Sequence, residues 1–133
     1  MIRKTTKVGK LKEGSFIIID DEPCRINHFL TSPPGKHGPG NAKIAATGLF
    51  NSQKHHIIQP TSAKIEVPII ERGIAEVLAT VANNVQLMDL TTYEIFELPI
   101  PVNLRGDVHE GDMVEYIQAL GRRKIELVKS YMR

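Results

Sequence analysis

The feature that most constrains the fold is a succession of short runs rich in β-branched and apolar residues, each followed by a turn signal. Branched and large side chains fit the half-buried surface of a sheet, whereas Gly, Pro, Asn, Asp and Ser favour turns. Short strands at regular spacing predict a small barrel or sandwich rather than a parallel sheet with helices. In the first half we expect strands at Ser15–Ile19, Cys24–Leu30, Lys43–Phe50, His55–Gln59 and Lys64–Val67.

The second half contains five more candidate strands and one longer interruption, Pro99–Asp112, which has room for a helical turn. Three strands, a short helical connection and two further strands are the order of a five-stranded OB barrel. We expect Tyr93, Phe96 and Tyr116 in its core or at the core edge. The five strands are predicted at Ile74–Val81, Val85–Asp89, Glu94–Leu98, Met113–Leu120 and Lys124–Val128.

A junction at residues 67–71 divides the chain of 133 residues into two parts. Pro68 disfavours a helix at the residue before it, so the junction is short and semi-rigid. The charge balance also changes sign nearby, from a net +5 over residues 1–70 to a net −3 over residues 71–133. We therefore expect one domain at residues 1–68 and a second at residues 69–133.

The composition argues against several classes of protein. Hydrophobic residues make up 41% of the chain, enough for a folded core. No apolar run approaches the roughly 18–20 residues that span a bilayer, and the charged N-terminus lacks the apolar segment of a secretory signal. Cys24 is the only cysteine, so an internal disulfide is excluded, which favours a reducing compartment. We expect a cytoplasmic protein with neither a membrane partner nor a small-molecule substrate.

A loop in the first half is rich in proline and glycine, and it reads Pro33-Pro34-Gly35-Lys36-His37-Gly38-Pro39-Gly40. Proline donates no backbone hydrogen bond and glycine tolerates positive φ, so this run fits neither a helix nor an inner strand. It predicts a stiffened, protruding loop of 13 residues, Thr31–Lys43, with Lys36 at or near its tip. Loops of this length are usually functional or disordered, and the flanking prolines argue against disorder.

Lys36 lacks the neighbours that lysine-based chemistry requires. A phosphate-binding P-loop needs a glycine five residues before Gly35 and a Ser or Thr after the lysine, but Leu30 and His37 stand there. A Schiff-base lysine needs a pKa lowered by burial or by a nearby cation, whereas a lysine at a glycine-rich tip is hydrated. The chain contains no nucleophile elbow, and no carboxylate pair stands out. We expect a protein that is not an enzyme and has no catalytic residue.

The histidines and the cysteine do not form a convincing metal site. His55 and His56 are adjacent, so on a strand they point to opposite faces. Cys24 and His28 share a face by parity, but two ligands make neither a closed nor an open zinc site. We expect no bound metal, ordinary packing for Cys24 and partial exposure of the histidines.

No acidic residue occurs between Glu22 and Glu66. Such a span is typical of a surface that faces a polyanion, and a solvated basic surface would look the same. Aromatic residues make up only 5%, without tryptophan, so an RNA contact would use phosphates and shape rather than base stacking. A second basic spot, in the turn between the last two strands, is otherwise a soluble hairpin tip. The RNA-contact candidates are Arg25, Lys54, Lys64, Arg122, Arg123 and Lys124.

Several ordered segments together resemble one known family. Residues 35–38, Gly-Lys-His-Gly, followed closely by Ala42-Lys43, resemble the hypusine loop of the translation initiation factor 5A family. Residues 8–14 and 20–25 resemble the family's opening, and Val67–Glu71 resembles its interdomain junction. The segment QLMDLTTYEIFEL at residues 86–98 is similar to the archaeal branch. The likeness covers nearly the whole chain.

The resemblance implies an all-β protein, with an N-terminal SH3-like barrel followed by a C-terminal five-stranded OB-fold barrel. It also implies that deoxyhypusine synthase moves an aminobutyl group from spermidine onto Lys36, and that the factor needs no other cofactor. The modified residue would act at the ribosomal E site beside rRNA and peptidyl-tRNA, promoting peptide bonds at stalled sequences such as proline runs and aiding termination. Bacterial elongation factor P is the related counterpart. The modification loop would include Pro34, Gly35, His37, Gly38 and Lys43.

The loop departs from the family pattern in two places. Pro33-Pro34 stand where the family usually carries Lys-Thr, and Pro39-Gly40 are an apparent insertion, so we expect a longer loop that is stiffer at its base. Two other interpretations stay open at this stage. One is an unmodified RNA-binding module, such as a ribosomal protein or an RNA chaperone, and the other is a lysine-dependent lyase.

Overall fold

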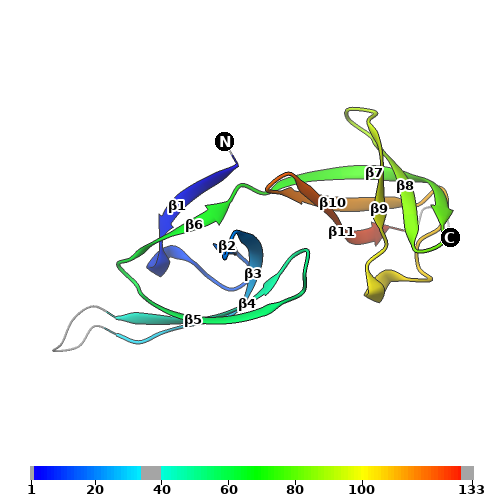
Figure 1. Ribbon diagram of the computed structural model, residues 1–133. Helices are drawn as coiled ribbons and strands as arrows, with labels where there is room; N and C mark the ends of the chain where they lie inside the picture. The colour runs from blue at the N-terminus through cyan, green and yellow to red at the C-terminus, as the bar shows by residue number, and fades with distance from the viewer. Residues whose placement is uncertain (1, 34–39, 130–133) are drawn as a thin grey trace. The chain divides into compact units, whose positions relative to one another are not determined.

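The computed structural model describes residues 2–33 and 40–129, and its chain forms two compact units, Met1–Ile69 and Ile70–Arg133 (Figure 1). Nearly all regular structure in the described residues is antiparallel strand, and the helical elements are two 3₁₀ turns. The prediction of an all-β protein is confirmed. Between the last strand of the first unit and the first strand of the second lie only Ile69 and Ile70.

The N-terminal unit consists of two curled sheets around one core. Strands β2, β3, β4 and β5 form an antiparallel sheet in that order, β1 pairs with β6, and β2 lies against β6. Strand β3 ends at Thr31 and β4 begins at Asn41. The elements are β1 (Arg3–Lys7), η1 (Val8–Lys10), β2 (Phe16–Ile19), β3 (Glu22–Thr31), β4 (Asn41–Gly48), β5 (Lys54–Pro60) and β6 (Lys64–Pro68).

Alternation along β4 defines the inner and outer faces of this sheet. Ala42, Ile44 and Ala46 are buried, while the residues between them point outward. Each fully buried isoleucine of this core stabilises the fold by roughly 1.5–3 kcal/mol. Cys24 is fully buried, as expected, and burial raises the pKa of its thiol. The core residues are Val8, Leu11, Ile17, Cys24, Ile26, Ala42, Ile44, Ala46 and Val67.

A β-bulge at Asn27 corrects one sequence-based expectation. The register shifts between the pairs Ile26–Ala46 and His28–Ala45, so one extra residue of β3 faces β4. Parity is therefore inverted beyond the bulge. Cys24 points into the core whereas His28 is exposed, so the prediction that they share a face is wrong.

Strand β1 was absent from the sequence-based prediction. Its sequence, RKTTK, has no apolar residue, and it is held by its pairing with β6 from Arg3 opposite Pro68 to Lys7 opposite Lys64. Long-range pairing of this kind overrides a weak local pattern.

The C-terminal unit is a five-stranded antiparallel sheet in the order β11-β10-β7-β8-β9. Its edge strands β9 and β11 contact each other, which curls the sheet towards a closed barrel. A 3₁₀ turn follows the third strand, so the predicted order of strands and helical connection is confirmed. The elements are β7 (Glu71–Val81), β8 (Asn84–Asp89), β9 (Ile95–Pro99), η2 (Val102–Leu104), β10 (Met113–Ala119) and β11 (Arg122–Lys129).

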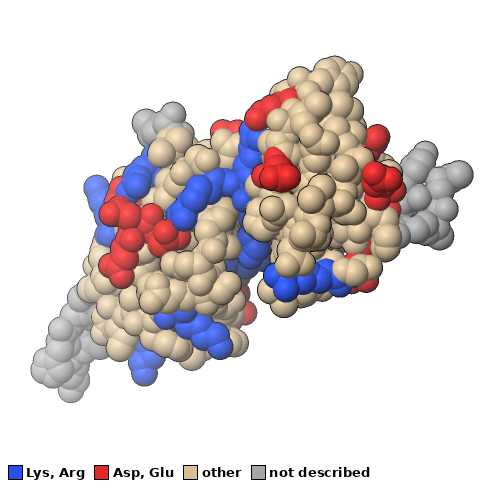
Figure 2. Space-filling view, turned by 45° about the vertical axis from the view of Figure 1, so that its right-hand side comes forward, with Lys and Arg blue, Asp and Glu red and all other residues tan. Residues whose placement is uncertain are grey.

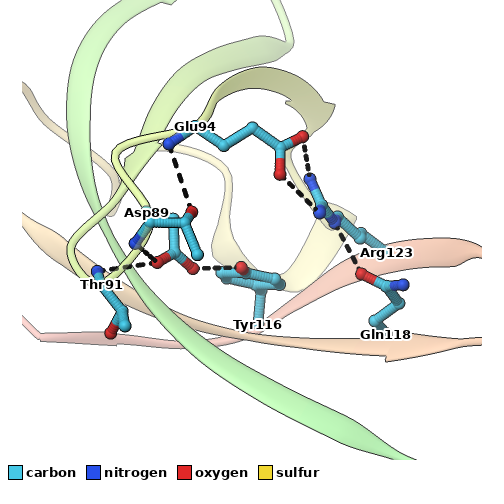
Figure 3. Close-up of polar contacts among 7 residues, drawn as sticks. Asp89, Thr91, Glu94, Tyr116, Gln118 and Arg123 are labelled. Atoms are coloured by element: carbon cyan, nitrogen blue, oxygen red, sulfur yellow. Dashed lines mark hydrogen bonds and ion pairs between the residues drawn. The ribbon is translucent and has the colours of Figure 1, made fainter.

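A polar cluster is built into the core of this unit (Figure 3). The buried Asp89 carboxylate accepts the Tyr116 hydroxyl hydrogen bond and two backbone N–H bonds from the following turn, which lower its pKa. Burial and the bond to Asp89 raise the pKa of Tyr116 to about 12. The Tyr116 ring meets Phe96 edge-on at 5.1 Å. Tyr93, by contrast, is 70% exposed in that turn, so its placement in the core was wrong.

Candidate functional site

The base of the predicted loop is anchored on both sides. The Ser32 backbone N–H donates to the Asn41 carbonyl at 2.9 Å, which continues the β3–β4 pairing. The Gly40 carbonyl accepts two bonds from Thr61, one from its backbone N–H at 2.9 Å and one from its hydroxyl at 3.1 Å. Thr61 in turn accepts a bond from the Gly9 backbone at 2.9 Å. The turn between β5 and β6 thus holds the returning end of the loop.

Gly40 allows the two ends to approach closely. It is buried, and a Cβ built on it would lie 2.1 Å from the Ser32 carbonyl oxygen, so no larger residue fits without displacing backbone. Strand pairing extends to Thr31 opposite Ala42, with Lys43 opposite Leu30. The predicted loop ends at Thr31 and Lys43 were therefore wrong, because both residues belong to paired strands. Nothing in the sequence pointed to Thr61 beyond its place in a turn.

Of the residues predicted to form the modification loop, only Lys43 lies within the described part of the chain. Pro34, Gly35, Lys36, His37 and Gly38 lie outside the described residues. Lys43 is described: it lies on the outer face of β4 and is exposed. Its role in the modification loop stays a prediction.

The outer face of β3, β4 and β5 brings together three of the predicted basic residues and two histidines. Strand pairing arranges them in three rows across the sheet. Next to the loop base, Leu30, Lys43 and Ile58 form the first row. Behind it come His28, Ala45 and His56, and then Arg25, Thr47 and Lys54.

The remaining candidates lie elsewhere. Lys64 is exposed on β6, opposite Lys7 of β1. Arg122, Arg123 and Lys124 belong to the C-terminal unit, and they lie on β11 rather than in the turn as predicted, because the tip is formed by Leu120 and Gly121.

Arg123 is engaged within its own unit (Figure 3). Its guanidinium forms a two-pronged ion pair with Glu94 at 2.9 and 3.0 Å, donates to Gln118 at 2.9 Å and lies 4.3 Å from the Phe96 ring centroid. The hydrogen bonds to Arg123 lower the pKa of Glu94, and those to Glu94 raise the pKa of Arg123. Arg123 therefore makes a structural contact within its unit, and its contact with RNA stays a prediction. Figure 2 shows the acidic side chains of the same unit spread over the face in view.

Within residues 2–33 and 40–129, no three or more His, Cys, Asp or Glu side chains are placed to hold a metal ion. In the same residues, none of the helical elements has the length and apolar character of a membrane span.

Comparison with known proteins identifies the family. Residues 3–63 match the family model described as translation initiation factor 5A-like, N-terminal. Translation initiation factor 5A of Archaeoglobus fulgidus is 48% identical over 94% of this chain and 98% of its own. The chain belongs to the translation initiation factor 5A family. A solved structure, eukaryotic translation initiation factor 5A from Methanococcus jannaschii, superimposes with a TM-score of 0.87 at 43% identity, covering 98% of this chain and 99% of that one.

Family membership confirms the resemblance seen in the sequence. The chain is a translation factor of archaeal type, with an SH3-like N-terminal unit and an OB-fold C-terminal unit. The anchored loop base and the three rows therefore lie on the SH3-like unit.

Proposed function

We propose that this factor acts on the ribosome through a chemically lengthened Lys36. Deoxyhypusine synthase would transfer the aminobutyl group of spermidine to the lysine amine. One C–N bond of spermidine breaks, one forms at Lys36 and diaminopropane leaves, with NAD serving the synthase. The product is a longer side chain with two positive charges in place of one. Membership of the family, together with Gly-Lys-His-Gly at residues 35–38, supports this assignment.

The anchored loop base supports this proposal on physical grounds. Gly40, Ser32 and Thr61 hold the two ends of the loop together, which fixes both of its points of attachment. A slim dication can enter a crevice between RNA phosphates that excludes a protein backbone. We infer that Lys36 steadies the acceptor end of peptidyl-tRNA beside the E site, which is catalysis by positioning.

In this mechanism the protein assists a reaction of the ribosome and is not itself an enzyme. The ribosome forms the peptide bond, and the factor restores a reactive pose when a nascent chain, such as a proline run, stalls. The same contact would assist termination. Its partners are then rRNA, peptidyl-tRNA and, before that, the synthase, and the place of action is the cytoplasm.

Peptide mass spectrometry of the factor purified from its own cells tests the modification. We expect an aminobutyl adduct on Lys36, with or without hydroxylation. An unmodified RNA-binding module would show the bare residue. A lysine-dependent lyase would instead be trapped on Lys36 by borohydride with a carbonyl substrate, and we expect no such product.

Lys36→Arg tests the role of the adduct. Guanidinium keeps the charge but does not accept the aminobutyl group, so we expect unchanged thermal unfolding and loss of the stimulation of peptide synthesis through proline runs. Lys4→Arg, on the exposed part of β1, is the matched control. Full activity of the Lys36 variant in reconstituted translation would contradict the proposal.

A further inference from the structure

We propose that the outer face of β3, β4 and β5 is a groove for a single RNA strand that leads to the base of the Lys36 loop. The inference rests on the proposed function and adds a binding surface to it. The face consists of the three cross-strand rows defined above, centred on Lys43, Ala45 and Thr47 of β4.

Two shallow hollows on this face are parts of one groove. They have volumes of about 410 and 440 Å³ and share His28, Ala45 and His56. One continues to Thr47 and Lys54, and the other to Leu30, Lys43 and Ile58 beside the loop base. The four-residue step from Lys43 to Thr47 corresponds to about 13 Å of strand, enough for a short stretch of nucleotides.

The charge of the groove suits phosphate. Among the described residues that line the two hollows, none is acidic, and two lysines and three histidines are present. Arg25 lies at the end of the groove that is farther from the loop base, in the same row as Lys54 but on the other side of Thr47. Its guanidinium is 5.1 Å from the Phe16 ring centroid. One carboxylate, Glu13, reaches the rim, 3.9 Å from His28 Nδ1.

The shape of the groove favours a single strand over a duplex. Its floor at Ala45 is low because that side chain is small, while imidazoles stand on either side. Leu30 and Ile58 are 67% and 63% exposed and flank Lys43, where they offer apolar contact to ribose and base faces. A rigid duplex would meet the long lysine side chains without reaching the floor.

The backbone argues against a peptide in this groove. Strand β4 is paired on both edges, with β3 and with β5, so its N–H and C=O groups are not available to add another strand. Recognition on this face must come from side chains. Cations, a small floor and aliphatic walls suit a ribose–phosphate chain.

Fluorescence anisotropy with a labelled single-stranded 12-nucleotide uridine RNA tests the groove on the full-length, modified protein. Lys54→Gln is compared with Lys4→Gln, since both lysines are exposed and only Lys54 lines the groove. We expect Lys54→Gln to weaken binding about 3- to 10-fold and to reduce the salt slope by about 0.7. We expect Lys4→Gln to change neither.

Ala45→Glu supplies a stronger test, with Ala45→Gln as the uncharged control of similar size. Ala45 points away from the core, and circular dichroism checks folding. We expect the glutamate variant to lose at least 10-fold in affinity and the glutamine variant to lose much less. An RNA duplex, measured in the same assay, should bind more weakly than the single strand, and its affinity should change less in Ala45→Glu.

The outcomes separate this inference from the proposed function. Wild-type RNA affinity in Lys54→Gln and Ala45→Glu, with the aminobutyl adduct still present on Lys36, would overturn the groove and leave the proposed function standing. A 12-residue polyglutamate peptide serves as a protein-like competitor. If it bound more strongly than the RNA, was not displaced by RNA and lost its binding in Ala45→Glu, the face would be a protein-binding surface and the inference would be overturned. A bare Lys36 together with groove-dependent RNA binding would overturn the proposed function alone.

Discussion

The loop base can form only because Gly40 has no side chain. The close approach of Gly40 to the Ser32 carbonyl means that Gly40→Ala must push the two ends of the loop apart. Overpacking of this kind costs about 1–3 kcal/mol of unfolding free energy. We expect lower stability in urea and less aminobutyl adduct on Lys36 when the synthase is co-expressed. Asn41→Ala, at the exposed neighbouring residue, serves as control. An unchanged midpoint and full modification would show that the approach is not needed.

The Tyr116–Asp89 hydrogen bond predicts how stability depends on pH. The pKa of Asp89 is lowered from 3.8, so this stabilisation is full above about pH 4 and is lost as pH falls through the lower value of the folded state. The pKa of Tyr116 is raised from 10.0 to about 12, so its contribution is lost as pH rises from 10 to 12.

Tyr116→Phe removes the bond and leaves the Asp89 carboxylate short of one donor. We expect a loss of about 1–3 kcal/mol at pH 7 and a smaller further loss between pH 4 and pH 2.5 than in the parent. Urea unfolding across that range measures both effects. Tyr93→Phe, at an exposed hydroxyl, should behave like the parent. Parallel acid profiles for the parent and Tyr116→Phe would refute the assignment.

Elements with a clear local pattern were predictable, and elements made by long-range pairing were not. The strands other than β1, and the helical connection of the C-terminal unit, follow from runs of β-branched and apolar residues separated by turn signals. The polar strand β1 and the bulge at Asn27 exist only because a partner strand is present. For the site, proline and glycine marked the loop. The three rows depend on which residues of β3, β4 and β5 are paired with one another. This pairing register cannot be inferred from the sequence alone.

Strands β9 and β11 flank an ion pair that the sequence did not reveal. Arg123 was predicted to reach RNA, yet its guanidinium is held by Glu94, which just precedes β9, and by the Phe96 ring. Arg123→Lys keeps the charge and loses the planar fork. We expect a lower unfolding midpoint with unchanged RNA affinity, whereas exposed Arg105→Lys should leave both unchanged. A drop in RNA affinity at constant stability would return Arg123 to the RNA-binding surface.

The whole chain consists of two units whose cores share no residue. One cluster contains only residues from Val8 to Val67, and the other only residues from Ala75 to Ile125. The basic excess belongs to the first unit and the acidic excess to the second. Stability and RNA binding should therefore respond separately to substitutions in the two units.

Gly73→Ala tests this separation. A Cβ at residue 73 would lie 2.4 Å from Tyr116 Cζ, so the substitution must displace the ring that holds Asp89. We expect the C-terminal unit to lose about 1–3 kcal/mol and unfolding to become two-step. The groove of the first unit should bind the single-stranded RNA with parental affinity below the first transition, because none of its lining residues belongs to the C-terminal core. A single transition that moves as a whole, with RNA affinity falling in step, would mean that the two units fold as one.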